Sequence, residues 1–190
     1  MSKGAFTVWF TGLSASGKST ICQALAEHLK KETDMDFQVI DGDCMRQTIN
    51  ANLGYTQAER NIASERIARV VKKLNDDGMT CLVSNISQDK AIRSKVRNII
   101  GNFVLVFVDT PVDVCEQRDY KQNYEKAKRG EIEEFVGVTE EYERADEAEI
   151  IIDTVSTKPE AAANLIVNYL REERWLGDEG KRECRLHAHK

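Results

Sequence analysis

The chain has 190 residues, of which 41% are hydrophobic and 31% charged, and its formal net charge is −5. This length suits one domain with a substantial core, and no run approaches the ~18 uninterrupted apolar residues of a membrane-spanning helix. The negative charge argues against a general nucleic-acid-binding protein, which needs a broad basic surface. We therefore expect one folded domain that binds neither nucleic acid nor a membrane.

Five apolar runs bounded by turn residues predict strands. In chain order they are TVWFTG (7–12), FQVIDGD (37–43), TCLVSNI (80–86), NFVLVFVDT (102–110) and EIIIDT (149–154). Most are unbroken rather than alternating, which suits strands covered on both faces. Apolar residues at helical spacing fall between them, in 21–29, 62–74 and 162–169. Strands alternating with helices predict an α/β fold, a five-stranded parallel sheet flanked by helices.

A phosphate-binding motif follows the first strand and precedes the first helix. Residues 10–20, FTGLSASGKST, match G-x-x-x-x-G-K-[ST] from Gly12 to Ser19. Backbone N–H groups of such a loop wrap around a β-phosphate, Lys18 can reach the β- and γ-phosphates, and the Ser19 hydroxyl can ligate Mg²⁺. The motif predicts an ATP-type triphosphate site with Mg²⁺. Its expected binding residues are Gly12, Ser14, Ala15, Ser16, Gly17, Lys18, Ser19 and Thr20.

Two carboxylates end the second strand. Asp41 and Asp43 stand at the carboxyl edge of the predicted sheet, the edge that also carries the phosphate loop. Phosphoryl transfer to an alcohol needs a carboxylate near Mg²⁺ and the acceptor hydroxyl. Alternatively, the D-G-D sequence makes a tight turn in which Asp43 caps the next helix. The functional interpretation makes Lys18, Asp41 and Asp43 catalytic, with Ser19 and Asp41 as metal ligands.

A highly charged segment from Arg118 to Glu143 breaks the alternation of strands and helices. Its composition leaves two interpretations open, a solvated helical excursion or a mobile lid over the site. The tail from Trp175 to Lys190 has little apolar periodicity, and we expect it to be loosely held. We therefore expect one nucleotide-binding domain over residues 1–174, in which the lid of the second interpretation would span about 118–143, and a tail over 175–190.

The N-terminus and the cysteines favour a cytoplasmic protein. The first ten residues, MSKGAFTVWF, lack the long apolar segment of a signal peptide. The five cysteines are odd in number and scattered, as expected of free thiols. Cys184, His187 and His189 lie close together without a fourth ligand nearby, so we do not predict a metal site there. A homodimer is compatible with the sequence, which does not determine the oligomeric state.

Several spaced motifs together resemble the adenylylsulfate kinase family. They run in order from about Thr7 to Thr154: GLSASGKST, DGDCMRQTINANLGYTQAER, ISQDKAIR, and DVCEQRDYKQNYEKAKRGEIEEFVGVTEEYE followed by IIIDT. The resemblance implies a P-loop kinase fold and an enzyme of sulfate assimilation. Such an enzyme uses MgATP to phosphorylate the ribose 3′-hydroxyl of adenosine 5′-phosphosulfate.

The resemblance also implies an acceptor pocket for this small nucleotide. It makes Asp41 the base or orienting carboxylate for the 3′-hydroxyl, with Asp43 close by. Arg46 and Arg60 would contact the phosphosulfate, and Ile86 and Ser87 would belong to the same pocket.

The resemblance assigns further roles to the lid and to two aromatic residues. Tyr55, where the family usually has Phe, would clamp the acceptor base against Phe135 of the lid, and stacking of a base is worth ~1–3 kcal/mol. Arg118 would pack on the ATP adenine, and Lys121 would carry positive charge to the phosphates when the lid closes. Taken singly, the aromatic residues could equally be core residues and the arginines surface charges.

Other positions besides Tyr55 also depart from the family pattern. Ala63 and Glu65 replace an asparagine and an arginine, Gln88 replaces a proline, and Gln122 replaces a glycine of the lid. We expect Glu65 either to point away from an anionic acceptor or to pair with Arg69, one helical turn later. The departures leave open a kinase for another nucleoside anhydride, such as cytidine diphosphoramidate. A nucleotide-dependent switch is a further alternative, although it would not need the acceptor pocket.

Overall fold

The predicted parallel sheet is confirmed in the computed structural model, which describes residues 4–177. The strands are β1 (Thr7–Thr11), β2 (Phe37–Asp41), β3 (Thr80–Ser84), β4 (Phe103–Asp109) and β5 (Ile150–Asp153). All pairings are parallel, in the order β2-β3-β1-β4-β5. The register pairs Asp41 with Ser84 and Thr11 with Phe107, so the ends of these strands meet at one edge.

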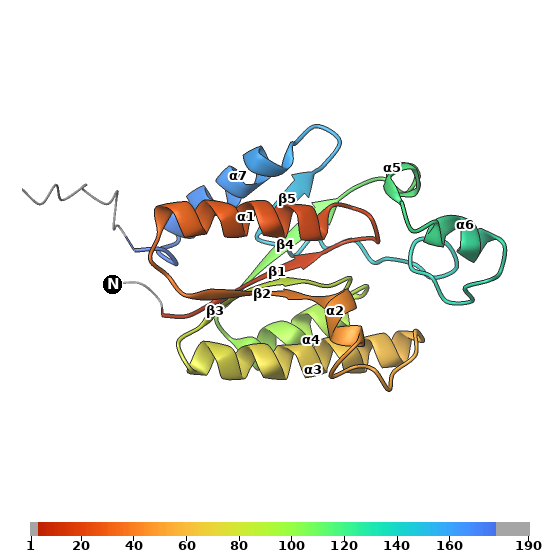
Figure 1. Ribbon diagram of the computed structural model, residues 1–190, viewed down its shortest axis with the longest axis horizontal. Coiled ribbons are helices and arrows are strands. Elements are labelled where there is room, and N and C mark those ends of the chain that lie inside the picture. Colours follow the sequence, from red (N-terminus) through yellow and green to blue (C-terminus); the bar gives the residue numbers. More distant parts are fainter. Residues whose placement is uncertain (1–3, 178–190) are drawn as a thin grey trace, which may run out of the picture.

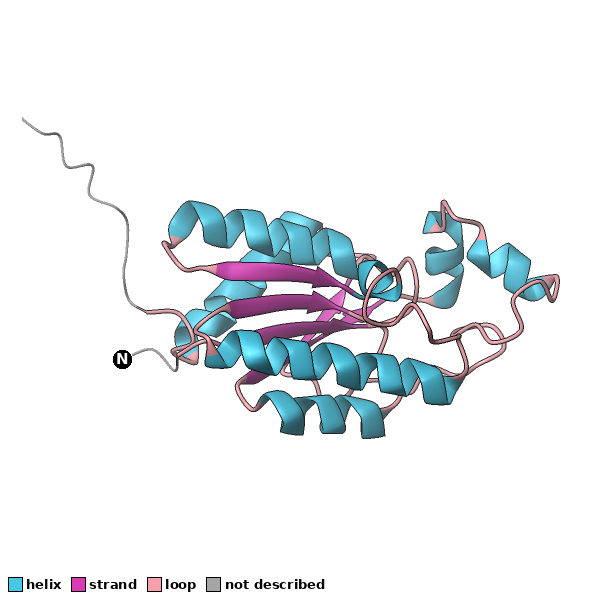
Figure 2. Ribbon diagram, turned by 60° about the horizontal axis from the view of Figure 1, so that its bottom comes forward, coloured by secondary structure: helices cyan, strands magenta, loops and turns pink. Residues whose placement is uncertain are grey.

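Helices cover both faces of the sheet (Figures 1 and 2). Helices α1 (Lys18–Glu32) and α7 (Pro159–Glu172) lie on one face, and α3 (Gln57–Asp76) and α4 (Lys90–Ile100) lie on the other. Three short helices are α2 (Gly42–Arg46), α5 (Val112–Arg118) and α6 (Asn123–Lys128). The sequence analysis identified α1, α3 and α7 by their apolar spacing but did not predict α4.

The apolar strands divide their side chains between two cores. Val8 and Phe10 of β1 pack in the cluster under α1 and α7, whereas Trp9 packs in the cluster under α3 and α4. Successive strand residues point to opposite faces, so an unbroken apolar strand needs cover on both. This requirement explains why the strands read as continuous hydrophobic runs.

The ordered core extends past the predicted boundary at residue 174. The Trp175 ring lies 5.3 Å from the Phe6 ring, and Leu176 is buried in the cluster under α1 and α7. Arg174 adopts a positive φ of 59°, and the next two backbone N–H groups return to the Leu170 carbonyl. This turn folds the chain back onto the core, which differs from a tail that is loose from Trp175 onward. Cys184, His187 and His189 lie outside the described residues.

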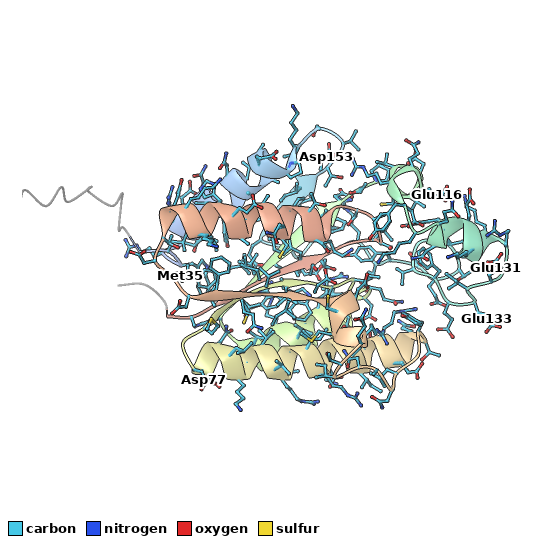
Figure 3. All side chains as sticks on the ribbon, in the orientation of Figure 1. Met35, Asp77, Glu116, Glu131, Glu133 and Asp153 are labelled. Atoms are coloured by element: carbon cyan, nitrogen blue, oxygen red, sulfur yellow. The ribbon has the colours of Figure 1, made fainter. Side chains whose placement is uncertain are left out.

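The lid segment, residues 118–143, extends beyond the carboxyl ends of the strands (Figure 2). Within it only α6 is a helix after Arg118, and the rest forms turns with one bridge between Val136 and Glu140. The segment is therefore less helical than predicted. Glu131 and Glu133 lie at its outer end, away from the sheet (Figure 3).

The lid segment has a small core of its own. Tyr124 and Val136 are buried against Leu13 of the phosphate loop and Cys115 of α5. The Tyr124 hydroxyl also donates a hydrogen bond of 2.9 Å to the Ser14 carbonyl. These contacts account for Tyr124 in an otherwise charged stretch, because they anchor the segment to the phosphate loop.

The chain between residues 4 and 177 contains no helix long and apolar enough to span a membrane. Its four described cysteines, Cys22, Cys44, Cys81 and Cys115, are free thiols. Over the same residues, no three His, Cys, Asp or Glu side chains gather in a group that could hold a metal ion by themselves.

Candidate active site

The phosphate loop turns between β1 and α1 through backbone conformations that most residues avoid. Gly12 and Gly17 have φ values of 144° and 105°, and Ala15 has a φ of 58°. A Cβ on Gly12 would lie 2.6 Å from the Val108 carbonyl oxygen, so this position requires glycine. The loop therefore packs directly against β4 at Gly12, and the rest of it leads into the start of α1 at Lys18.

Lys18 is held inside the curve of this loop. Its Nζ donates to the carbonyl oxygens of Gly12 and Leu13, at 3.0 and 2.6 Å. Burial lowers the pKa of the Lys18 ammonium group from 10.5 to about 8, and the nearby Cys115, Asp43 and Asp41 oppose this shift. A phosphate in the loop would favour the charged form of the group.

Asp41 links the second strand to the phosphate loop. Its Oδ2 accepts hydrogen bonds from Ser19 and Ser84, at 2.7 and 2.8 Å. Its Oδ1 accepts from the Asp43 backbone N–H at 2.8 Å, so Asp41, rather than Asp43, caps the following helix α2. Burial alone would raise the pKa of Asp41, but the hydrogen bonds from Ser19, Ser84 and the backbone outweigh it and lower the pKa.

The glycine between the two aspartates lets neighbouring strands approach. A Cβ on Gly42 would lie 2.8 Å from Asn85 Oδ1 and 3.1 Å from the Ser84 carbonyl oxygen. The D-G-D sequence leads directly from β2 into α2. The alternative that Asp43 caps this helix is wrong, since Asp41 does so, and Asp41 also lies beside Ser19 of the phosphate loop.

Asp43 and Lys121 join the sheet edge to the lid segment. Lys121 Nζ lies 3.0 Å from Asp43 Oδ2, with both side chains largely exposed. The hydrogen bond and charge of Asp43 raise the pKa of Lys121. This exposed pair contributes little to stability, but it places a lid cation at the same edge as Asp41.

Three predicted acceptor-binding residues lie on α2, on α3 and in the loop between them. Arg46 donates to the Gly54 carbonyl at 2.6 Å, and its guanidinium lies 4.7 Å from the centre of the Tyr55 ring. Arg60 donates to the Tyr55 carbonyl, to the Glu134 carbonyl of the lid segment at 3.2 Å, and to the Gln88 side chain at 2.6 Å. The two arginines are thus anchored mostly to neutral groups rather than to carboxylates.

Arg118 is connected to the phosphate loop through two threonines. It donates to the Thr154 hydroxyl at 2.8 Å and to the Thr154 carbonyl at 3.0 Å. Thr154 and Thr110 share a hydrogen bond of 2.6 Å, and Thr110 donates to the Ser16 carbonyl at 3.0 Å. The chain of bonds fixes Arg118 at the α7 side of the loop.

One cavity of about 580 Å³ connects these groups. Of the residues predicted for the site, Gly12 and Phe135 lie outside its lining, and Phe135 packs on Tyr124 with ring centres 4.8 Å apart. Tyr55 and Phe135, predicted to clamp a base, thus have separate partners in the described part of the chain. The predicted residues in the lining are Ser14, Ala15, Ser16, Gly17, Lys18, Ser19, Thr20, Asp41, Asp43, Arg46, Tyr55, Arg60, Ile86, Ser87, Arg118 and Lys121.

The cavity also contains polar residues that the sequence analysis did not assign. Asn61, Ser64, Asn85 and Gln88 line it. Asn85 directly follows β3, so the rule that identified Asp41 at the end of β2 would have found it. Ser64 lies four residues after Arg60 on α3, and this spacing places two residues on one helix face. Gln88 gave no signal beyond its departure from the family pattern.

The two departures on α3 do not bring negative charge into the cavity. Ala63 is buried, and neither it nor Glu65 is part of the cavity lining in residues 4–177. Glu65 pairs with Arg69 at 3.3 Å, which was one of its two predicted arrangements. It also pairs with Lys95 at 2.5 Å.

Comparisons with known proteins agree with this geometry. A family model described as adenylylsulphate kinase matches residues 4–153. An adenylyl-sulfate kinase of Synechococcus sp. strain JA-3-3Ab is 39% identical over 176 residues, which cover 93% of this chain and 99% of that protein. An adenylyl-sulfate kinase of Lactiplantibacillus plantarum is 44% identical over 171 residues, which cover 89% and 82% of the two chains.

Solved structures give the same result. The APS kinase CysC of Mycobacterium tuberculosis, in complex with AMPPNP and APS, superimposes with a TM-score of 0.83 at 35% identity. The match covers 88% of this chain and 98% of that one. Sequence and structure are thus similar over nearly the whole length of these proteins, and the chain belongs to the adenylylsulphate kinase family.

Proposed function

We propose that this chain transfers the γ-phosphoryl group of ATP to the ribose 3′-hydroxyl of adenosine 5′-phosphosulfate. The products are ADP and 3′-phosphoadenosine 5′-phosphosulfate. The observation that carries the proposal is that one cavity contains the phosphate loop, the carboxylates of Asp41 and Asp43, and two arginines suited to an anionic acceptor. Family membership supports the choice of acceptor.

The ATP half of the cavity is formed by α1, the phosphate loop and the residues around Arg118. Backbone N–H groups at the start of α1 favour an anion there, and Lys18 adds a charge beside the same loop. Arg118 is held by Thr154 with its planar group at the cavity wall, where it can stack on a purine. These groups bind and orient the nucleotide.

Ser19 and Asp41 fit the requirements of Mg²⁺. The Ser19 hydroxyl and the Asp41 carboxylate lie within 2.7 Å of each other, and both are the oxygen ligands that this ion prefers. Bound by these two residues, Mg²⁺ would neutralise part of the charge on the transferring phosphoryl group.

Asp41 acts on the acceptor mainly by orienting it. Its lowered pKa keeps the carboxylate ionised at neutral pH and makes it a weak base. Transfer through a loose transition state needs little proton abstraction before the bond to the leaving group weakens. An ionised Asp41 can therefore accept a hydrogen bond from the 3′-hydroxyl and hold it in line with the phosphoryl group.

The acceptor half of the cavity lies at Arg46, Tyr55 and Arg60. The guanidinium groups can donate to the phosphosulfate, and the Tyr55 ring, 63% exposed, offers a face on which a base can stack. The lid segment meets this half through Glu134, whose carbonyl accepts from Arg60. We propose that it closes over both substrates and excludes water, with Lys121 contributing charge near the phosphates.

The cytidine anhydride alternative receives no specific support. Glu65 is neutralised by Arg69 and Lys95, so its charge does not disfavour the phosphosulfate. A nucleotide-dependent switch would leave the polar acceptor half of the cavity without a role.

The oligomeric state of this chain is a separate question. An APS kinase of Thiobacillus denitrificans, 26% identical with a TM-score of 0.70, is described as hexameric, and this chain covers 30% of its length. A homodimer of this chain stays a prediction, as does its cytoplasmic location.

The reaction products test the proposed function. We expect the chain, mixed with ATP, Mg²⁺ and adenosine 5′-phosphosulfate, to form equal amounts of ADP and the 3′-phosphorylated product, measured by ion-exchange chromatography. Chelation of Mg²⁺ should stop the reaction. Preferential phosphorylation of cytidine diphosphoramidate would replace the proposed acceptor, and ATP hydrolysis without transfer would favour the switch.

Substitution of the two aspartates tests their roles. Asp41→Asn keeps a side chain that can cap α2 but loses the charge, so we expect kcat to fall by about 100-fold or more while ATP still binds. Asp43→Asn loses the exposed contact to Lys121 and should have a smaller effect. Steady-state kinetics and ATP titration provide the measurement. A greater loss of kcat in Asp43→Asn would reverse the two roles.

The pKa of Lys18 predicts a pH dependence of ATP affinity. The folded chain loses this proton around pH 8, well below the ordinary value of 10.5. Since ATP favours the protonated lysine, its dissociation constant should rise roughly tenfold between about pH 7.5 and 9. Calorimetric titration checks this, with Lys18→Ala as the control that binds weakly without the rise. A constant affinity in the wild-type chain across this interval would contradict the assignment.

A further inference from the structure

Arg60 is held by three parts of the chain that are distant from one another in sequence. Its Nε donates to Gln88 Oε1 at 2.6 Å, and its NH1 group donates to the carbonyls of Tyr55 and Glu134. These partners belong to the loop before α3, the loop between β3 and α4, and the lid segment. All three hydrogen bonds go to neutral oxygen atoms. The carboxylates of Glu134 and Glu140 act on Arg60 only through their charge, without a hydrogen bond to it.

The remaining nitrogen of Arg60 has an unused donor capacity. A guanidinium has five N–H groups, and the three bonds above leave both on NH2. NH2 is buried and has no hydrogen-bond partner among the residues that the structure describes. An unsatisfied buried donor is costly, and because Arg60 is one of the residues that line the cavity, a ligand that enters there and supplies an acceptor would remove this cost.

Gln88 is fixed as firmly as the arginine that it contacts. It is 3% exposed, and its carbonyl accepts from the Glu143 N–H at 2.9 Å. The preceding Ser87 has a φ of 46°, a conformation that turns the chain sharply at this point. Arg60 Nε can only donate, so the oxygen of the Gln88 amide must face it. A proline, which the family pattern has at this position, would offer no side-chain acceptor.

We propose that Gln88 is a positioning residue for Arg60. By holding Nε, its side-chain oxygen fixes the plane of the guanidinium, and this orientation reserves NH2 for the anionic phosphosulfate end of the acceptor. The inference rests on the proposed function, because it names the group that binds this end of the substrate. Gln88 acts through Arg60 and takes no part in the transfer itself.

The acceptor affinity should therefore depend on Gln88. Gln88→Met keeps the length of the side chain but loses the amide oxygen, which leaves Nε unpaired and the guanidinium free to turn. We expect the KM for adenosine 5′-phosphosulfate to rise about tenfold, the effect of one charge-assisted hydrogen bond. The kcat and the KM for ATP should change by less than about twofold, since Arg60 lies in the acceptor half.

A double-mutant cycle separates positioning from a direct or merely structural role. In an Arg60→Ala background, Gln88→Met should raise the acceptor KM no further, because the residue that it positions is absent. Equal fold-changes in both backgrounds would overturn the proposal. The matched control is Gln57→Leu, which removes another glutamine side-chain bond, to Asp89 at 3.2 Å, outside the cavity lining. It should leave the acceptor KM unchanged.

A spectroscopic readout tests the contact without any substrate. We expect the Arg60 Nε–H resonance, assigned by its absence in Arg60→Lys, to exchange slowly in the wild-type chain. Its exchange should be faster in Gln88→Met and stay slow in Gln88→Glu, which keeps a side-chain oxygen acceptor. Unchanged exchange in Gln88→Met would overturn the proposal. If the wild-type chain failed to phosphorylate adenosine 5′-phosphosulfate, the proposed function would fall, and this readout would still decide whether Gln88 positions Arg60.

Discussion

The hydrogen bonds that Asp41 accepts from Ser19 and Ser84 hold the site together, because they join three strands at their carboxyl ends. Ser19 belongs to the helix that follows β1, Asp41 ends β2 and Ser84 ends β3. The parallel register brings these positions level, and glycine at position 42 lets the backbones approach. The proposed metal ligands, the phosphate loop and the acceptor carboxylate therefore share one fixed frame.

An acidic chain forms this anion site by concentrating a few positive groups, two of which make their hydrogen bonds to neutral oxygen atoms. Lys18 contacts carbonyl oxygens, and Arg60 contacts carbonyl and amide oxygens. Glu65, the one acidic departure on α3, is paired with two surface cations. The net charge of −5 is a property of the whole chain, whereas the binding of an anion depends on the local arrangement of charges in the cavity.

The sequence predicted those parts of the fold and site that depend on local pattern. Apolar runs bounded by turn residues located all five strands, and the spacing from Gly12 to Ser19 located the phosphate loop. The Arg60–Gln88 contact joins residues 28 positions apart on separate elements, and no local rule connects them. The same reason explains Phe135, whose packing on Tyr124 follows from the fold of the lid segment rather than from its own surroundings in sequence.

The most direct test of this account is a crystal structure of the chain with Mg²⁺, a non-hydrolysable ATP analogue and adenosine 5′-phosphosulfate. The account predicts the metal ion on Ser19 and Asp41, the 3′-hydroxyl beside the Asp41 carboxylate, and the phosphosulfate on NH2 of Arg60. A 3′-hydroxyl far from Asp41, with the metal ion bound to neither Ser19 nor Asp41, would contradict it.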